Sequence, residues 1–184
     1  VKRRPVSRRH QIIRKSGQQN ERGGALLELA LVLPLIMAFV TGVVTGGIGL
    51  SRDISLNNAA REGARFGATL PYTDLSAFLN TVADVSVNAA TGELDDGEPA
   101  REVCVAYVYP DGTDPVDRTT RLVVDAAGGR TITVGAVCYP DSRPNGERRV
   151  QVNAARTTEL QAAFWSSTIT IEGSSTVRYE RAGQ

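Results

Sequence analysis

Histidine is nearly absent from this chain of 184 residues, whose single copy is His10, near the N-terminus. A Ser-His-Asp triad, a Cys-His pair and a histidine-ligated metal site each require an imidazole in the domain that holds them. The sequence after His10 therefore excludes these catalytic and metal-binding classes. Glycine-rich phosphate loops are missing too, because TGGIG at 45–49 and GELDDG at 92–97 lack the required lysine or strand context.

Acidic residues are plentiful, but they fall in two turn-like stretches, at 93–98 and 111–117. Aspartate is common in turns because its side chain bonds to nearby backbone groups, so these stretches do not favour the paired-acid chemistry of glycosidases. Neither stretch has the ligand spacing of an EF-hand, and a loosely built Ca²⁺ site is the alternative that stays open. We therefore expect no catalysis and no cofactor. The acids are Glu93, Asp95, Asp96, Glu98, Asp111, Asp114 and Asp117.

Charge is distributed unevenly along the sequence. Residues 1–23 contain eight Lys or Arg residues and one acid, a net +7, which leaves −6 for the remainder of a chain whose formal total is +1. A basic tail of this kind is typical of a nucleic-acid contact or of the cytoplasmic flank of a membrane helix. The segment that follows decides between these two interpretations.

From Ala25 to Leu50 the sequence is apolar, and Glu28 is its one ionisable residue. At about 1.5 Å per residue, this run is long enough to cross a hydrocarbon core of roughly 30 Å. A secretory signal has a shorter apolar core and a small-residue cleavage site, whereas this run continues into a helical pattern at 51–65. We expect a retained anchor, and therefore a membrane partner rather than nucleic acid. The basic flank places the N-terminus in the cytoplasm and residues 51–184 outside.

Only two cysteines are present, Cys104 and Cys138, and both lie in apolar, strand-like runs. Outside the cytoplasm such a pair predicts a disulfide. Two buried free thiols are the alternative. A zinc site is disfavoured, because two cysteines without a downstream histidine provide too few ligands.

Small residues recur at helical spacing through one long predicted helix at 25–69, which contains Pro34 and ends before Pro71. Small residues one turn apart allow another helix to approach closely, so they predict helix packing, both within the span and beyond it. The alternative is a helix that is merely rich in alanine and glycine. The residues concerned are Gly42, Gly46, Ala60, Ala64 and Gly67.

The remaining sequence predicts an α+β domain. An apolar stripe at 74–90 indicates a second helix, capped by Thr73 or Asp74 and followed by Gly92. About five runs rich in Val, Ile, Thr and Tyr follow, separated by turn signals, and predict an antiparallel sheet that packs on the helix in two layers. Residues 157–165 are ambiguous between a short helix and a loop that carries Phe164 and Trp165 toward the core or the membrane. The runs are 101–109, 120–126, 130–139, 147–154 and 167–180.

Glu28 is the unusual residue of the anchor. A carboxylate at the start of a membrane helix is costly unless it is paired or lies in the interface, where the helix dipole favours it. The string Arg22-Gly23-Gly24-Ala25-Leu26-Leu27-Glu28 offers a more specific interpretation. A basic leader, a glycine and then glutamate at the fifth position of an apolar helix resemble the prepilin-peptidase site of type IV pilins.

The longer string ERGGALLELALVLPLIMAFVTGVV, followed by NNAAREGARFGA, is similar to the TadE/TadF-like minor pilins (pseudopilins) of tight-adherence, Flp-type pilus systems. Their N-termini typically run RGxxxxEFALVLP into a helix that ends in NxAREGAR. The resemblance covers about residues 21–68, with a weaker similarity at 168–180, and Leu29 stands where the family usually has Phe.

This resemblance implies cleavage between Gly23 and Gly24 by a membrane aspartic prepilin peptidase. Glu28 would then be the fifth residue of the mature chain and would pair with the N-terminal amine of a neighbouring subunit during assembly, as a buried carboxylate needs a cation. The implied partners are the peptidase, other pilin or pseudopilin subunits and the pilus assembly platform.

These observations together predict three parts: a basic leader at 1–23, a transmembrane and assembly helix at 24–70, and an extracytoplasmic α+β domain at 71–184. The predicted function is that of a minor pilin that assists assembly of a Flp-type pilus without catalysis of its own. The alternative is an uncleaved single-pass envelope protein whose exterior domain is an adhesion or partner-binding module.

Overall fold

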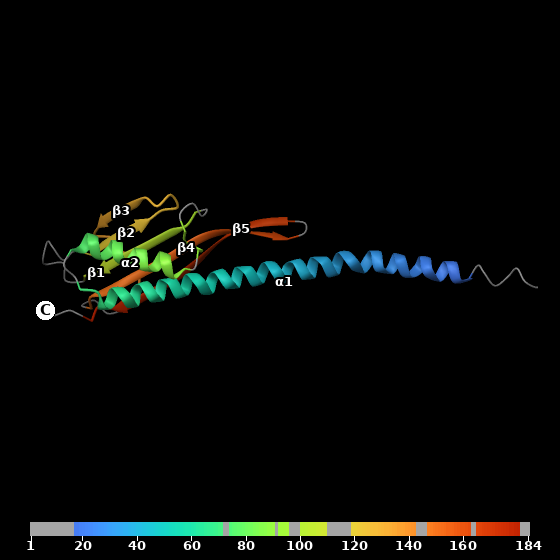
Figure 1. The fold of residues 1–184 in the computed structure, drawn as a ribbon, viewed down its shortest axis with the longest axis horizontal. Helices are drawn as coiled ribbons and strands as arrows, with labels where there is room; N and C mark the ends of the chain where they lie inside the picture. The colour runs from blue at the N-terminus through green and yellow to red at the C-terminus, as the bar shows by residue number, and fades with distance from the viewer. Residues whose placement is uncertain are drawn as a thin grey trace, which may run out of the picture. The chain divides into compact units, whose positions relative to one another are not determined.

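A computed structural model describes residues 17–71, 74–90, 92–95, 100–109, 119–142, 147–162 and 165–180. The segment 1–16, most of the two acidic stretches, Thr73 and Phe164 lie outside these residues. The chain divides into two units, one ending at Val43 and one beginning at Val44. The elements are α1 (Gly17–Thr69), α2 (Leu75–Ala89), β1 (Glu102–Val108), β2 (Thr120–Val124), β3 (Arg130–Val134), β4 (Arg149–Ala162) and β5 (Trp165–Arg178) (Figure 1).

Helix α1 is a single helix of 53 residues that continues through Pro34. Its C-terminal part belongs to the second unit, where Leu56, Ala59, Ala60 and Ala64 are fully buried. The second unit therefore begins inside the helix, at Val44, and includes residues 44–70 as well as the segment from 71 onward. One wall of its core is thus a helix that continues directly from the apolar run.

Helix α2 begins where the sequence predicts, and Asp74 is confirmed as its N-cap. The Asp74 carboxylate accepts hydrogen bonds from the backbone N–H groups of Ser76 and Ala77, each at 3.2 Å. These bonds satisfy two donors that the first turn of a helix leaves unpaired. The face of α2 that lies in the core is formed by Phe78, Leu79, Val82, Ala83 and Ser86.

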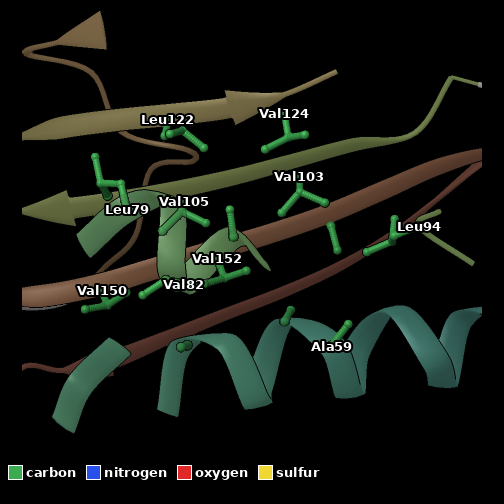
Figure 2. Packing of buried hydrophobic residues seen from close by; sticks show 14 of the residues in the cluster. Ala59, Leu79, Val82, Leu94, Val103, Val105, Leu122, Val124, Val150 and Val152 are labelled. Carbon is green, nitrogen blue, oxygen red and sulfur yellow. The ribbon is translucent and has the colours of Figure 1, made fainter. Parts of the chain in front are cut away.

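The predicted antiparallel sheet of five strands is confirmed, with the strand order β3-β2-β1-β4-β5. Strand side chains alternate between the two faces, so every second residue of the central strands faces the helices. Figure 2 shows these side chains between the sheet and the helices. The strand residues of this core include Val103, Val105, Tyr107, Leu122, Val124, Val150, Val152 and Ala154.

The opposite face of the sheet is partly covered by the segment after β3. Strand β3 was predicted to reach residue 139, but it ends at Val134. The reason is that Gly135 has a φ of +79°, a conformation that favours glycine and turns the backbone out of the strand. The chain then reaches Cys138, which forms the predicted disulfide with Cys104 of β1. The alternative of two free thiols is therefore wrong.

Polar contacts hold the same segment to strand β4. The Gln151 side chain accepts from the Cys138 N–H at 3.2 Å and donates to the Tyr139 carbonyl oxygen at 3.0 Å and to the Asp141 carboxylate at 2.7 Å. Asp141 also forms an ion pair with Arg149 at 2.9 Å, in which each side chain is 9% exposed. The disulfide and these contacts together close the second face of β1.

Of the ambiguous stretch 157–165, the described residues 157–162 and 165 lie in strands, and Phe164 lies outside the described residues. Strand β4 continues to Ala162, and β5 begins at Trp165, so the two strands form a long hairpin. The pairing of Thr157 with Thr170 and of Thr158 with Ile169 explains the difference, because β-branched residues favour strands when a partner strand is available.

Gly173 of β5 lies against the backbone of α1. A Cβ at this position would lie 2.5 Å from both the Asn57 nitrogen and the Leu56 carbonyl oxygen, and backbone atoms cannot move aside as a flexible side chain can. We expect Gly173→Ala to lower the free energy of unfolding by about 1–3 kcal/mol. Denaturant titration followed by circular dichroism would measure this loss.

The neighbouring variant Ser174→Ala provides the matched control, since Ser174 is an exposed residue of the same strand. Its unfolding midpoint should stay close to that of the parent chain. Equal midpoints for the two variants would contradict the tight approach of β5 to α1.

Candidate functional site: the exposed apolar helix

Residues 23–50 of α1 form an apolar surface that the described chain leaves largely exposed. None of its side chains from residue 23 to residue 50 is buried, and Leu26, Phe39 and Leu50 are 68%, 74% and 68% exposed. Burial of one such side chain is worth about 1.5–3 kcal/mol, so sixteen large apolar residues exposed along α1 could not remain in water. A helix that is apolar all round requires a membrane or an assembly to cover it.

By length and composition, one helix among the described residues can cross a membrane, and it lies near the N-terminus between Gly23 and Thr69. The apolar window of this helix is not buried within the molecule. This arrangement fits a single-pass membrane protein.

Glu28 lies in the exposed apolar part of α1. Its carboxylate forms no hydrogen bond or ion pair with any residue that the structure describes. Gly23 and Gly24 precede it in helical backbone, and a methyl group added at either glycine would meet no other described part of the chain within 4 Å. Gly23, Gly24 and Glu28, the residues predicted for processing and assembly, therefore lie in one exposed helical segment.

The small residues of α1 divide into two groups. Gly42 and Gly46 are exposed, and a Cβ at either would meet nothing within 4 Å, so this stretch is open to a partner. Ala60, Ala64 and Gly67 are buried in the chain's own core. A Cβ at Gly67 would lie 3.0 Å from Val82 of α2 and 3.0 Å from Val150 of β4.

The second group thus brings α1 close to α2 and to the sheet of the same chain. Gly63, one turn before Gly67, lies against Ser86 of α2 in the same way. The helical spacing of small residues was visible in the sequence, but the identity of the packing partner was not.

Sequence reasoning missed a polar cluster where the apolar run ends. Arg52 is the first charged residue after Glu28, and its Nε lies 3.5 Å from a carboxylate oxygen of Glu93. Arg156 of β4 pairs with the same carboxylate, and Arg52 also donates to the Thr158 hydroxyl at 3.2 Å. These contacts hold the hairpin and the loop after α2 to the turn of α1 that follows the apolar run. The only sequence signal was the position of Arg52 at the edge of the span.

No group of three His, Cys, Asp or Glu side chains within the described ranges is arranged to hold a metal ion. The features that the site offers for contact lie at its exposed surface. Its elements are an apolar helix, one carboxylate and two glycines at the helix start.

Residues 23–65 match the family model described as TadE-like protein. This part of α1 is therefore similar to TadE-like proteins. The match begins at Gly23, covers the whole exposed apolar stretch and ends within the buried small-residue part, so it includes none of the sheet. No curated protein and no solved structure matches the chain significantly.

Over residues 23–65, the match agrees with the resemblance to TadE-like proteins found in the sequence. The TadE-like family is not an enzyme family, and it is linked to membranes and to pilus components. Within the TadE-like helix, the exposed apolar side chains and Glu28 are the features that remain for contacts outside the chain.

Proposed function

We propose that this chain is a minor pilin, or pseudopilin, that assists assembly of a Flp-type pilus. The observation that carries this proposal is the position of Glu28, the one charged residue of the apolar, exposed stretch 23–50 of α1, within the part that matches the TadE-like model. Such a helix can lie first in a membrane and then against the helices of neighbouring subunits, because both surroundings cover apolar side chains. The single carboxylate needs a cation in either place.

The cation in this proposal is created by processing. A prepilin peptidase cleaves between Gly23 and Gly24, and the new amino group of Gly24 on one subunit pairs with Glu28 of its neighbour. The absence of any partner for Glu28 among the described residues supports a contact between chains. The open surroundings of Gly23 and Gly24 support access by the peptidase.

The proposed topology follows from charge. The basic segment before Gly23 stays in the cytoplasm, and the α+β domain with its disulfide lies outside, where disulfides persist. The exposed pair Gly42 and Gly46 offers a close approach to another helix of the assembly. The pilus assembly platform and other pilin subunits are the proposed partners.

Processing can be tested by measuring the N-terminal mass after expression with an active prepilin peptidase. The parent chain should lose residues 1–23, and Gly23→Leu should keep them, because a large side chain replaces the glycine beside the scissile bond. Gly17→Leu, six residues earlier, is the matched control and should be cleaved like the parent chain. A catalytically inactive peptidase should leave all three intact. Retention of the leader in the parent chain with the active peptidase would contradict the proposed processing.

A further inference from the structure

The two outer strands of the sheet have nearly the same sequence along their edges. The strand order makes β3 and β5 the edge strands, and no other described strand pairs with their outer sides (Figure 1). Residues 131–134 of β3 have the sequence TITV, and residues 168–171 of β5 have the sequence TITI. Neither stretch contains a charge, a proline or a bulge, which are features that usually keep edge strands from pairing with another chain.

At the β3 edge, backbone groups and apolar side chains are exposed together. The Gly135 N–H donates to the Thr119 carbonyl oxygen at 2.6 Å, and bonding alternates along an antiparallel ladder. Counting back from Gly135, the N–H and C=O groups of Ile132 and Val134 point away from β2. The side chains of these two residues are 44% and 59% exposed.

The β5 edge offers the complementary groups. The Tyr179 N–H donates to the Arg148 carbonyl oxygen at 2.8 Å, and the register of β5 with β4 is continuous from there. The same alternation leaves the backbone N–H and C=O groups of Thr168, Thr170 and Glu172 pointing away from β4.

Strand direction and side-chain faces also agree between the two edges. Four antiparallel pairings separate β3 from β5, so the two strands run in the same direction. Ile132 is on the helix side of the sheet with its partner Leu122, which is buried in the core. Gly173 faces α1, so Ile169 and Ile171 of β5 are also on the helix side.

We propose that the β3 edge of one chain pairs in parallel with the β5 edge of a second copy, with Ile132 beside Ile169. Each residue of a parallel pair bonds to the two residues that flank its partner. Ile132 then donates to the Thr168 carbonyl oxygen and accepts from the Thr170 N–H, which are groups that point outward. The four pairs are Thr131–Thr168, Ile132–Ile169, Thr133–Thr170 and Val134–Ile171.

This register is the one that matches like side chains. β-Branched residues pack well beside one another on a pleated surface. A shift by two residues would place Val134 beside Gly173 in one direction or Ile132 beside Ser167 in the other. A shift by one residue would place the apolar side chains of the two copies on opposite faces.

The helix layer has room for the second copy. Helix α2 lies on β1 and β2, and α1 approaches β4 at Val150 and β5 at Gly173. Ile132 and Val134 are thus at the side of the helix layer, which explains their exposure. In the proposed pair, the α1 of the second copy lies on the strand next to them.

Pairing of two β3 strands about a two-fold axis is the competing arrangement. It would be antiparallel and centred on Ile132, and it would place Arg130 of each copy beside Val134 of the other. A charge would then lie beside an apolar side chain at both ends, whereas the β3–β5 pair joins like with like. The β3–β5 contact also leaves each pair with one free edge of each kind, so it can repeat along a row of chains.

The contact is small and adds to the helix contacts of the proposed function without requiring cleavage at Gly23. Four residues on each side bury far less surface than a standard interface of about 1,600 Å². It therefore forms where other contacts or a shared membrane hold the chains close together, because a high effective concentration favours weak contacts.

Crosslinking of the full, uncleaved chain in phospholipid vesicles tests the register. Chains with Thr131→Cys are reconstituted together with tagged chains that carry Thr168→Cys, and a short bismaleimide joins neighbouring thiols without opening the native disulfide. Both positions are exposed, and the proposed register places them side by side. We expect dimers that contain one chain of each kind, and few dimers from either variant alone.

Ser174→Cys in place of Thr168→Cys is the matched control. Ser174 is exposed on the same face of β5, but it lies six residues, or about 20 Å, farther along the strand. This combination should give few dimers. Equal yields from the two combinations would overturn the proposal. So would equally abundant dimers from Thr131→Cys alone, which would indicate the two-fold pairing of β3 strands.

A charge at the centre of the edge provides a second test. Added to the Thr131→Cys chain, Ile132→Lys should remove most of the mixed dimer, because the charge would lie beside Ile169 of the second copy. Ala127→Lys places the same charge in the exposed turn before β3 and should leave the yield unchanged. Thermal unfolding followed by circular dichroism checks that both domains are folded. Equal yields from these two folded variants would overturn the proposal.

This contact and the proposed function fail separately. The vesicles contain no peptidase and no other pilin, so neither cleavage at Gly23 nor pairing of Glu28 with another subunit type affects the yield. Absence of the mixed dimer would remove the edge contact and leave the proposed function in place. Retention of the leader in the presence of active peptidase would contradict the processing and leave the edge contact in place.

Discussion

Replacement of Glu28 with alanine should abolish assembly with pilus subunits and leave the C-terminal domain folded. Removal of one member of a buried ion pair leaves the other charge unpaired and typically costs about 3–5 kcal/mol, which corresponds to a loss of association of about 10²–10⁴-fold. Glu28→Gln should lose most of this association as well, because the amide keeps the shape of the side chain without its charge. Co-purification of pilus components with the solubilised protein would measure the effect.

Glu62→Ala is the matched control on the same helix. Glu62 is also an exposed glutamate of α1, with its nearest ion-pair partner Arg65 at 3.8 Å, but it lies beside the domain rather than in the apolar run. Surface pairs of this kind contribute little to stability, so this variant should assemble normally. If Glu28→Ala assembles as well as Glu62→Ala, the pilin proposal fails, and the uncleaved envelope-binding module becomes the better interpretation.

Loss of the Cys104–Cys138 disulfide should lower the free energy of unfolding of the domain by about 3–4 kcal/mol. The bond joins residues 34 positions apart, so its removal increases the conformational entropy of the unfolded chain by the cost of closing a loop of that length. Most domains are stable by only about 5–15 kcal/mol, which makes this one of the largest effects available from two substitutions. Denaturant titration of the double variant Cys104→Ala/Cys138→Ala in detergent would measure it.

Reductant provides the control for the disulfide. It should lower the unfolding midpoint of the parent chain toward that of the double variant and leave the double variant unchanged. The segment after β3 should stay near the sheet in the reduced protein, because Gln151 still bonds to Cys138 and Tyr139. An unchanged midpoint in the parent chain after complete reduction would contradict the predicted stabilisation.

The sequence was sufficient to predict the helices and strands whose positions depend on local residue preferences. Asp74 before an apolar stripe predicted the start of α2, and runs of β-branched residues predicted the five strands. The end of β3 was misplaced because Val137 and Cys138 continue the strand-like pattern, whereas Gly135 turns the backbone. Residues 157–165 were ambiguous because Glu, Leu, Gln and Ala favour helices, and only pairing with β5 decides the conformation.

The residues of the candidate site could be predicted from the sequence, but their packing partners could not. The apolar run, the position of Glu28 and the glycines before it follow from the order of residues alone. The pattern of Ala60, Ala64 and Gly67 was equally visible, but periodicity does not say whether a small-residue face packs on its own chain or on another. The cluster of Arg52, Glu93 and Arg156 was hidden because its members come from three separate segments, and only the fold brings them together.

The burial of α1 in the core has a mechanical consequence. A force applied along the helix at Val44 enters the domain through Leu56, Gly63 and Gly67, which are packed against α2 and the sheet. The force would therefore act in shear on many packed side chains at once, and it would not separate the strands of the sheet one by one. A fragment that begins at residue 71 would lack one wall of the core, whereas a fragment that begins near Ser51 would keep it.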